Sequence, residues 1–355
     1  MAEVSTAKEN VKRVFYVRTL NHPCYLDIIG QRPEIRLDKL ENDTPDTASD
    51  PIIAAAHAYQ CSSARDELPA KYHVDKGLLS RAPNLLVIST GGAGYDTVNV
   101  KDCTDAGVLV VNQSGGNADA VASHVLAMIL MLSKQIIQTN HALRKGTMKD
   151  RTAFTGSDIH GKTIGICGLG NVGRRVAGLC RTLFNMQVLA YDPYLDEKTI
   201  AERGATKVEL DELLRRSDFV SINCPLDDGS RGMISAGQFA LMQKHAYFIT
   251  TARGHIHDEG ALEEALRSKA IAGAGLDVWS KEPPEMNHPL LQYDNVIASP
   301  HTAGVTREAR ANMGKFAAEQ LVMILDGKRP PRIINPDVWP AYQKRFEKTF
   351  GILPQ

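Results

Sequence analysis

The chain has 355 residues, and its 41 lysines and arginines balance its 41 aspartates and glutamates, so the formal net charge is zero. At roughly 150 residues per domain, this length predicts two domains, each large enough to bury a core of its own. A balanced charge offers no electrostatic attraction for nucleic acid or for an anionic membrane, so neither partner is expected.

Short apolar runs that alternate with helical patterns dominate the chain. The predicted strands are, in chain order, Val14–Val17, Ala54–Tyr59, Leu85–Thr90, Val108–Asn112, Thr163–Cys167, Gln187–Tyr191, Phe219–Asn223, Tyr247–Thr251, Gly273–Val278 and Val296–Ser299. Several are almost continuously apolar, which is typical of strands that helices bury on both faces. The alternation predicts an α/β fold with parallel sheets.

Two long helical patterns accompany these strands. The first, from about Ala118 to Arg144, separates the strands into two groups, and the second runs from Thr306 to about Leu325 and ends at Gly327. The tail beyond Gly327 is rich in proline and aromatic residues. We expect this tail to wrap over a neighbouring surface rather than to form another domain.

Neither a targeting segment nor a membrane span is expected. Residues Met1–Asn10 are polar and mixed in charge, and the apolar stretch Val121–Leu132 is too short to cross a bilayer. The six cysteines are scattered and lack the CxxC spacing of redox and zinc sites. They indicate reduced thiols and a cytoplasmic protein.

A glycine-rich turn follows the predicted strand Thr163–Cys167. Gly168, Gly170 and Gly173 form the pattern G-x-G-x-x-G in front of a helical segment. In such a turn the first glycine permits a tight bend, the second lets the backbone approach a pyrophosphate, and the third lets the helix pack closely on the strand. The helix N-terminus then faces the anion, so the motif predicts dinucleotide binding.

The residues after the next strand favour NAD over NADP. Asp192 ends the predicted strand Gln187–Tyr191 and lies about 20 residues beyond the last glycine, where a carboxylate accepts hydrogen bonds from the adenosine ribose. Pro193 and Tyr194 follow, so no arginine stands next to Asp192 to receive a 2′-phosphate. The predicted cofactor is NAD.

Side chains that can bind a ligand or exchange protons follow the later strands, where open α/β sheets bind their ligands. Cys224, Arg253 and His301 each come after a predicted strand, and Asp277 lies at the end of one. Taken singly, an arginine is more often a surface ion pair and a histidine a core residue. Together, an arginine fork suits a carboxylate, and a histidine beside a carboxylate such as Glu282 can exchange a hydroxyl proton while NAD carries the hydride.

In these motifs the chain resembles the D-isomer-specific 2-hydroxyacid dehydrogenases. The resemblance extends from about residue 85 to 336 and rests on Gly168–Gly173, Ala252–Gly254, Gly275–Trp279 and Ser299–Gly304. It implies two Rossmann-like domains, with a doubly wound parallel-sheet NAD domain (116–304) inserted into a flavodoxin-like substrate domain (1–115 plus 305–355). It also implies a homodimer that forms through residues 118–154.

The resemblance also assigns roles to single residues. His301 is expected to be the acid/base, Glu282 its partner and Arg253 the substrate anchor. The substrate acid is expected at the loop Gly92, Ala93 and Gly94, through backbone N–H groups. The residues expected to bind the cofactor are Gly168, Gly170, Asn171, Val172, Gly173, Asp192, Cys224, Pro225, Ser230, Thr251, Ala252, Arg253, Asp277, His301 and Gly304.

The implied activity is hydride transfer between NAD(H) and a 2-oxo acid/(R)-2-hydroxy acid pair. Glyoxylate, hydroxypyruvate and bulkier aromatic 2-oxo acids all remain open as substrates. One alternative is a phosphoglycerate dehydrogenase, which the absence of arginine and lysine from Thr90–Gly94 disfavours. The other is an NAD-sensing scaffold that resembles the C-terminal binding proteins.

One departure from the family pattern lies directly after Arg253. His255 and His257 stand where small or aliphatic residues are usual, and their H-x-H spacing would suit two metal ligands on one face of a strand. No further ligands follow nearby, so no metal is expected. The sequence assigns no role to either histidine.

Overall fold

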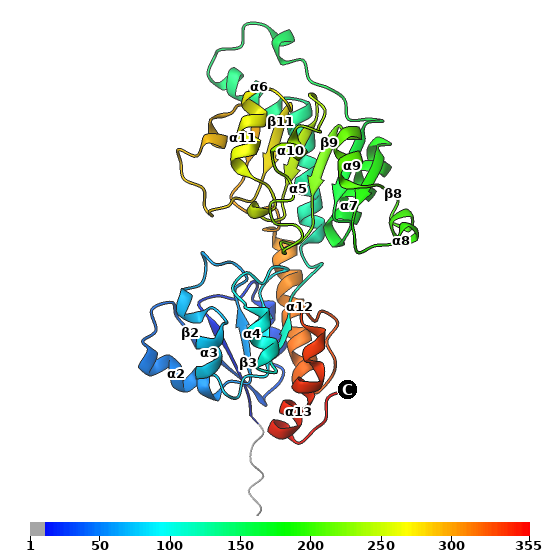
Figure 1. Ribbon diagram of the computed structural model, residues 1–355. Helices are drawn as coiled ribbons and strands as arrows, with labels where there is room; N and C mark the ends of the chain where they lie inside the picture. The colour runs from blue at the N-terminus through cyan, green and yellow to red at the C-terminus, as the bar shows by residue number, and fades with distance from the viewer. Residues whose placement is uncertain (1–10) are drawn as a thin grey trace, which may run out of the picture. The chain divides into compact units, whose positions relative to one another are not determined.

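The computed structural model describes residues 11–355 (Figure 1). The chain divides into two compact units. The first unit comprises the chain up to Asn117 together with Thr306–Gln355, and the second unit is the continuous segment Ala118–Val305. In sequence, the second unit is therefore inserted into the first.

The first unit contains a five-stranded sheet in the order β2-β1-β3-β4-β5, with every pair parallel. Its strands are β1 Lys12–Val17, β2 Ile35–Leu40, β3 Ala58–Cys61, β4 Val87–Thr90 and β5 Leu109–Val111. Its helices are α1 Cys24–Ile29, α2 Asp46–Ala55, α3 Lys76–Arg81, α4 Val100–Asp105, α12 Arg307–Leu325 and α13 Trp339–Phe350, with 3₁₀ turns η1 Ala70–Tyr72 and η5 Pro336–Val338. This strand order is that of flavodoxin-like folds.

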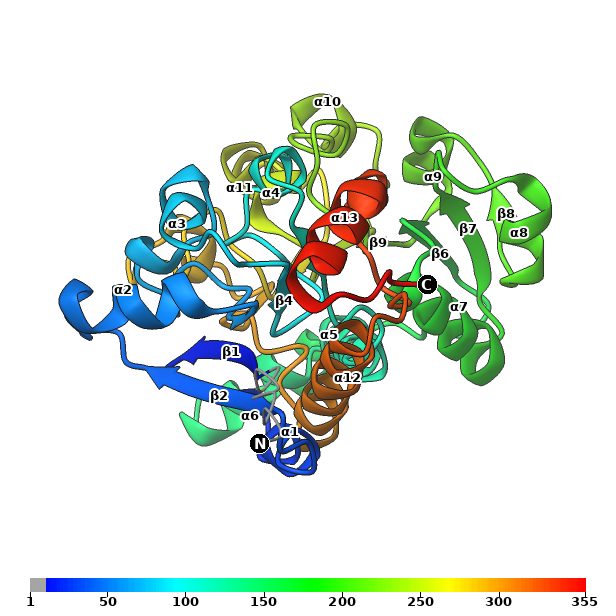
Figure 2. The same ribbon diagram turned by 90° about the horizontal axis from the view of Figure 1, so that it is seen from below.

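Helices bury both faces of this sheet. Val14 and Phe15 are adjacent on β1 and fully buried, yet they belong to different clusters because successive side chains point to opposite faces. Val14 packs in the cluster of α1, α12 and α13, and Phe15 in the cluster of α2, α3 and α4. Figure 2 shows β1 and β2 side by side at the sheet edge.

The second unit contains a seven-stranded parallel sheet in the order β12-β11-β10-β9-β6-β7-β8. Its strands are β6 Thr163–Cys167, β7 Gln187–Tyr191, β8 Thr206–Lys207, β9 Phe219–Ile222, β10 Tyr247–Thr250, β11 Gly273–Leu276 and β12 Val296–Ala298. Its helices are α5 Ala118–Ser133, α6 Ile136–Arg144, α7 Asn171–Phe184, α8 Glu197–Glu202, α9 Leu210–Arg216, α10 Ala236–Phe239 and α11 Glu259–Arg267, with 3₁₀ turns η2 Arg151–Phe154, η3 Gly254–Ile256 and η4 Pro289–Gln292.

The strand order of this sheet locates its ligand-binding edge. The chain enters at β6, proceeds outward to β7 and β8, and returns to β9 on the other side of β6. Such a reversal opens a crevice at the carboxyl ends of β6 and β9. Helices α5 and α7 cover one face of the sheet, and α9, α10 and α11 cover the other, so the unit is doubly wound.

The predicted helix Ala118–Arg144 is two helices. Gln135 adopts a left-handed backbone conformation with φ 50°, and α5 and α6 are bent by 61° at this break. Among residues 11–355, no single helix is long and apolar enough to cross a membrane, and only this bent pair reaches the required length and composition together.

Three other expectations differ from the structure. The predicted strand Ala54–Tyr59 begins at Ala58, because α2 continues to Ala55. Strands β2 and β8 lie at sheet edges and were not predicted, since β2 carries three charged residues and β8 has only two residues. The tail contains α13, a helix whose Trp339, Tyr342, Phe346 and Phe350 are buried in the core of the first unit.

Candidate active site

The glycine turn joins β6 to α7 and leaves its backbone open on one side. Gly168 has φ +88°, and a Cβ placed there would lie 2.7 Å from the backbone nitrogen of Cys224. A Cβ at Gly173 would lie 2.1 Å from the carbonyl oxygen of Gly168, whereas nothing lies within 4 Å of the corresponding position at Gly170. Packing therefore requires the first and third glycines, and the second is free for a close approach. The turn fits a dinucleotide pyrophosphate.

Asp192 holds this turn from the end of β7. Its Oδ2 accepts a hydrogen bond from Leu169 N at 2.9 Å, and its Oδ1 accepts one from Tyr194 N at 3.1 Å. Arg203 donates from Nη1 to the carbonyl oxygen of Leu169. Arg203 was not predicted at this site, because no local pattern connects it with a turn 34 residues away.

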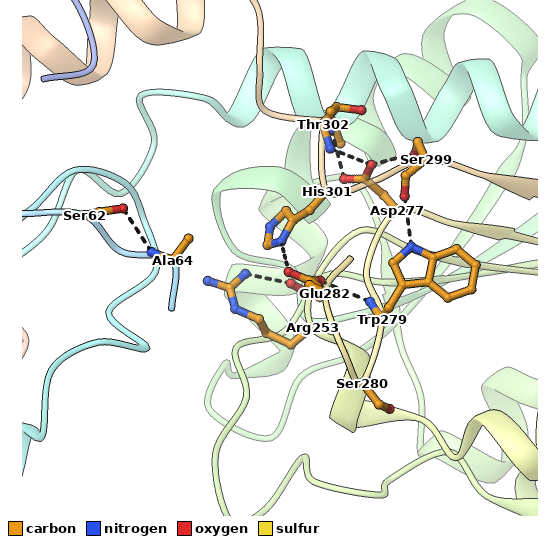
Figure 3. Close-up of polar contacts among 12 residues, drawn as sticks. Ser62, Ala64, Arg253, Asp277, Trp279, Ser280, Glu282, Ser299, His301 and Thr302 are labelled. Atoms are coloured by element: carbon orange, nitrogen blue, oxygen red, sulfur yellow. Dashed lines mark hydrogen bonds and ion pairs between the residues drawn. The ribbon is translucent and has the colours of Figure 1, made fainter. Parts of the chain in front are cut away.

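His301 and Glu282 form a hydrogen-bonded pair (Figure 3). His301 Nδ1 lies 2.8 Å from Glu282 Oε2, and Glu282 Oε1 accepts a hydrogen bond from the backbone N–H of Trp279 at 3.1 Å. The carboxylate is therefore fixed on both sides. With Nδ1 engaged, Nε2 is the ring nitrogen that can exchange a proton with a ligand.

Neighbouring charges determine the protonation of this pair. The hydrogen bond to Glu282 raises the pKa of His301 above its usual value, against the opposing effects of burial and of Arg253, while Asp277 adds to the rise. Burial alone would raise the pKa of Glu282, but the hydrogen bond and charge of His301 lower it. The pair thus favours an imidazolium beside a carboxylate.

Arg253 comes from the loop after β10. Its Nη1 donates to the carbonyl oxygen of Ala252 at 2.7 Å, and its charge acts on the pKa of both His301 and Glu282. The next residue is Gly254, where a Cβ would lie 2.1 Å from the carbonyl carbon of Trp279. This close backbone contact brings the arginine loop against the loop that carries Glu282.

Asp277 is fully buried, and its carboxylate holds the turn on which His301 lies (Figure 3). Its Oδ1 accepts hydrogen bonds from Ser299 Oγ at 2.6 Å and Thr302 N at 2.8 Å, and its Oδ2 accepts one from Ala303 N at 2.9 Å. Its backbone carbonyl accepts a further bond from His301 N at 2.7 Å. Asp277 therefore holds the turn that carries His301, and the contact with the cofactor that the family resemblance implies stays a prediction.

The other residues expected at the cofactor flank the same sheet edge. Cys224 lies against Gly168, and burial raises the pKa of its thiol to about 12, so it remains protonated. Ser230 closes its own loop, since its Oγ donates to Pro225 O at 2.7 Å and accepts from Asp227 N at 2.9 Å. Asn171 and Val172 begin α7, Thr251 and Ala252 directly precede Arg253, and Gly304 follows the His301 turn.

In the first unit, the loop after β4 directs its carbonyl groups inward. Gly92 O accepts hydrogen bonds from Gln113 N at 2.9 Å and from Thr90 Oγ1 at 3.1 Å, and Ala93 O accepts one from Asn112 Nδ2 at 2.6 Å. The backbone N–H groups of Ala93 and Gly94 have no partner among the described residues. They remain available to donate to an anion.

The two histidines after Arg253 have different environments. His255 is exposed on η3, whereas His257 is 3% exposed and its ring lies 5.4 Å from that of Phe248. Burial lowers the pKa of His257 to about 4, and neither of its ring nitrogens has a partner among residues 11–355. In this part of the chain no group of three or more His, Cys, Asp or Glu side chains could hold a metal ion.

Comparison with known proteins identifies the family. The family model for the D-isomer specific 2-hydroxyacid dehydrogenase, NAD binding domain, matches residues 126–303. A glyoxylate reductase from Aeropyrum pernix is 38% identical over 279 residues, which cover 77% of this chain and 83% of that protein. The chain belongs to the D-isomer-specific 2-hydroxyacid dehydrogenase family. The predicted family is confirmed, and the match to an NAD-binding domain confirms NAD as the predicted cofactor.

Two further comparisons concern length and fold. A D-3-phosphoglycerate dehydrogenase from Archaeoglobus fulgidus is 38% identical over 269 residues, which cover 76% of this chain but only 51% of that protein. The chain thus spans about half the length of that relative. The crystal structure of a glyoxylate reductase from Paecilomyes thermophila matches with a TM-score of 0.81 and 26% identity, over 91% of this chain and 98% of that one. The predicted α/β fold with two Rossmann-like domains is confirmed.

Proposed function

We propose that this family member is an NAD-dependent 2-oxo acid reductase that forms (R)-2-hydroxy acids and catalyses the reverse reaction. The observation that carries the proposal is the His301–Glu282 pair beside Arg253. It lies in the same unit as a glycine turn that fits a dinucleotide. In this proposal Ala118–Val305 is the NAD-binding domain, and the first unit is the substrate domain.

Each side chain of the site has one task in the reduction. Arg253 binds the substrate carboxylate and polarises the adjacent carbonyl, because a guanidinium donates two parallel hydrogen bonds. NADH supplies the hydride when it is bound. His301 then donates its Nε2 proton to the carbonyl oxygen, and Glu282 favours the imidazolium that makes this donation possible near neutral pH. In the reverse direction His301 takes up the proton.

The first unit supplies backbone recognition in this proposal. Ala93 and Gly94 donate their N–H groups to the substrate carboxylate. Gly92 has no side chain and so keeps the loop small. Small 2-oxo acids such as glyoxylate and hydroxypyruvate are the first candidates. A phosphorylated substrate is disfavoured because Thr90–Gly94 contains neither arginine nor lysine.

We further propose that the protein is a cytoplasmic homodimer that forms through residues 118–154. Large apolar side chains are exposed in this segment, with Leu143 70%, Ile136 46% and Met148 38% exposed. Solvent-exposed apolar groups of this kind are typical of surfaces that another chain covers. Light scattering should give the mass of two chains, and the Leu143→Glu variant should shift the equilibrium toward one.

A substrate panel tests the proposed activity. Glyoxylate, hydroxypyruvate, pyruvate, phenylpyruvate and 3-phosphohydroxypyruvate would each be mixed with the protein and either NADH or NADPH. Loss of NADH absorbance with at least one of the unphosphorylated acids is expected. Tight NADH binding without consumption of NADH by any acid would contradict the proposal and favour an NAD-sensing scaffold.

A further inference from the structure

A histidine from α5 reaches the turn that carries His301. His124 Nε2 lies 3.1 Å from Ser299 Oγ and 3.9 Å from Asp277 Oδ1. Helix α5 passes close over the sheet here, since a Cβ at Gly275 on β11 would lie 2.9 Å from the sulfur of Met128. Because His124 and Met128 are four residues apart, they share the face of α5 that lies against β11 and β12.

The hydrogen bonds in this group run in one direction. An ionised carboxylate only accepts, so the single hydroxyl proton of Ser299 is donated to Asp277. Ser299 Oγ must then accept from His124, whose Nε2 carries the hydrogen. The chain of donors from His124 to Ser299 to Asp277 is complete, and hydrogen bonds in such a chain strengthen one another.

The turn that these hydrogen bonds support has a strained backbone. His301 has φ 55°, a left-handed backbone conformation that residues with a Cβ rarely adopt. Thr302 and Ala303 donate to the Asp277 carboxylate, and Trp279 Nε1 donates to the carbonyl oxygen of Ser299 at 3.0 Å. The strained conformation persists because these bonds fix the residues on both sides of His301.

We propose that His124 and Ser299 are positioning residues, which hold the Asp277 carboxylate and thereby the left-handed turn that aims His301. This inference rests on the proposed function of His301 as the acid/base. In this proposal the hydrogen bonds that Asp277 accepts from Ser299, Thr302 and Ala303 give its carboxylate a role in holding the turn. The positioning role of His124 predicts that its loss affects proton transfer and leaves NADH binding unchanged.

Two disruptive and two conservative variants test the proposal. His124→Phe removes the donor, and Ser299→Ala removes the hydroxyl. His124→Gln keeps an N–H near the position of Nε2, and Ser299→Thr keeps the hydroxyl. Ser123→Ala is the matched control, because Ser123 is exposed on the same helix and its Oγ bonds only to Asp119 O of that helix.

Three measurements separate positioning from general structural damage. We expect His124→Phe and Ser299→Ala to lower kcat about 10- to 100-fold, since small misplacements of reacting groups have effects of this size. The NADH dissociation constant, from fluorescence titration, should stay within twofold of the parent value. The pKa of His301, from NMR of its ring, should fall as its contact with Glu282 loosens, while Arg253 and Asp277 still face it.

The conservative variants and the control determine the outcome. His124→Gln and Ser299→Thr should restore most of the loss, and Ser123→Ala should match the parent. The proposal is wrong if His124→Gln is as impaired as His124→Phe, or if the disruptive variants weaken NADH binding as much as they lower kcat. It is also wrong if they leave the pKa of His301 unchanged.

The NMR titration separates this proposal from the proposed function. A parent protein that reduces no 2-oxo acid would overturn the activity, yet the pKa of His301 in the variants would still test the positioning. Conversely, a fully active His124→Phe variant would leave the activity intact and overturn the positioning role.

Discussion

The two sheets have the same parallel architecture but present different chemistry at their carboxyl ends. Beyond β4 in the first unit, the backbone N–H groups of Ala93 and Gly94 donate to none of the described residues, and uncharged side chains hold the loop. Beyond β10, β11 and β12 in the second unit, charged and titratable side chains hold one another. Recognition of an anion needs only a backbone, whereas proton transfer needs particular side chains.

This difference explains which unit carries recognisable motifs. A loop that works through its backbone accepts many sequences, so it leaves a weak pattern. In the proposed reaction, Arg253, Glu282 and His301 must be those residue types because the reaction uses their charge and proton affinity.

Loss of the His301 imidazole should have the largest effect. His301→Gln keeps the size of the side chain but removes the exchangeable ring proton, and kcat should fall about 10²–10⁴-fold. His245 is the matched control, since it also lies 2.8 Å from a carboxylate, that of Asp218, but at an exposed position. His245→Gln should stay within a few-fold of the parent. Equal rates for both variants would mean that His301 is not the acid/base.

Loss of the Asp192 carboxylate should act on the cofactor alone. Asp192→Ala removes a charged acceptor, so NADH should bind about 10- to 100-fold more weakly, as measured by fluorescence titration. NADPH should lose less affinity, because a repelling charge disappears and Arg203 remains on the same turn. The control is Asp196→Ala, which removes only the N-cap of α8. An unchanged NADH affinity in Asp192→Ala would contradict the assignment of Asp192 to cofactor binding.

Loss of the Glu282 charge should move the pH dependence of the reduction. The hydrogen bond to Glu282 raises the pKa of His301, and reduction needs the protonated ring. In Glu282→Gln this pKa falls, so kcat/KM for reduction should decline at a lower pH than in the parent. Near pH 8 the variant should be about tenfold slower. Glu285→Gln, which removes only an exposed partner of Lys281, is the control. A pH profile like that of the parent would refute the role of Glu282.

A change in the first unit should affect substrate binding and spare NADH binding. Asn112→Ala removes the hydrogen bond to Ala93 O, so the loop with the Ala93 and Gly94 donors loosens. KM for the 2-oxo acid should rise about 5- to 10-fold at a similar NADH dissociation constant. Asn84→Ala removes a comparable bond to Ala54 O elsewhere in the unit and should leave KM unchanged. A rise in both KM and the NADH dissociation constant would contradict the division of substrate and cofactor binding between the two units.

The smallest effect concerns His257, a titratable group to which the proposed reaction assigns no role. The pKa of buried His257 is lowered to about 4 from 6.5, so protons bind the unfolded chain more readily and the parent loses stability as pH falls below about 6.5. His257→Phe should unfold like the parent at pH 7 and be about 2 kcal/mol more stable at pH 5, as measured by urea denaturation. The exposed His160→Phe is the control. No gain at pH 5 would show that His257 finds a partner.

Much of the fold could be predicted because buried parallel strands are continuous apolar runs. β6 and β7 begin and end at the predicted residues. The edge strand β2 could not be predicted, since three charged residues interrupt its apolar pattern, and neither could the break at Gln135, where no glycine or proline interrupts the helical pattern. Tertiary context determines both features.

At the site, the sequence predicts residues with a chemical signature and misses those that act through distant contacts. Arg253, Glu282 and His301 lie in short motifs, and the structure brings them together. The bond of His124 with Ser299 joins residues 175 positions apart, and that of Arg203 with Leu169 joins residues 34 apart. No spacing rule along the chain predicts such hydrogen bonds, because they arise from packing.

The placement of α12 and α13 has a consequence for biosynthesis. Their buried side chains complete one face of the first sheet, yet they are translated after the whole second unit. On the ribosome, Ala118–Val305 is therefore a continuous segment that can fold first, while Val14, Val87 and Leu109 await the last fifty residues. The N-terminal part of the first unit spends this interval with an apolar sheet face uncovered, and chaperone binding during synthesis should concentrate there.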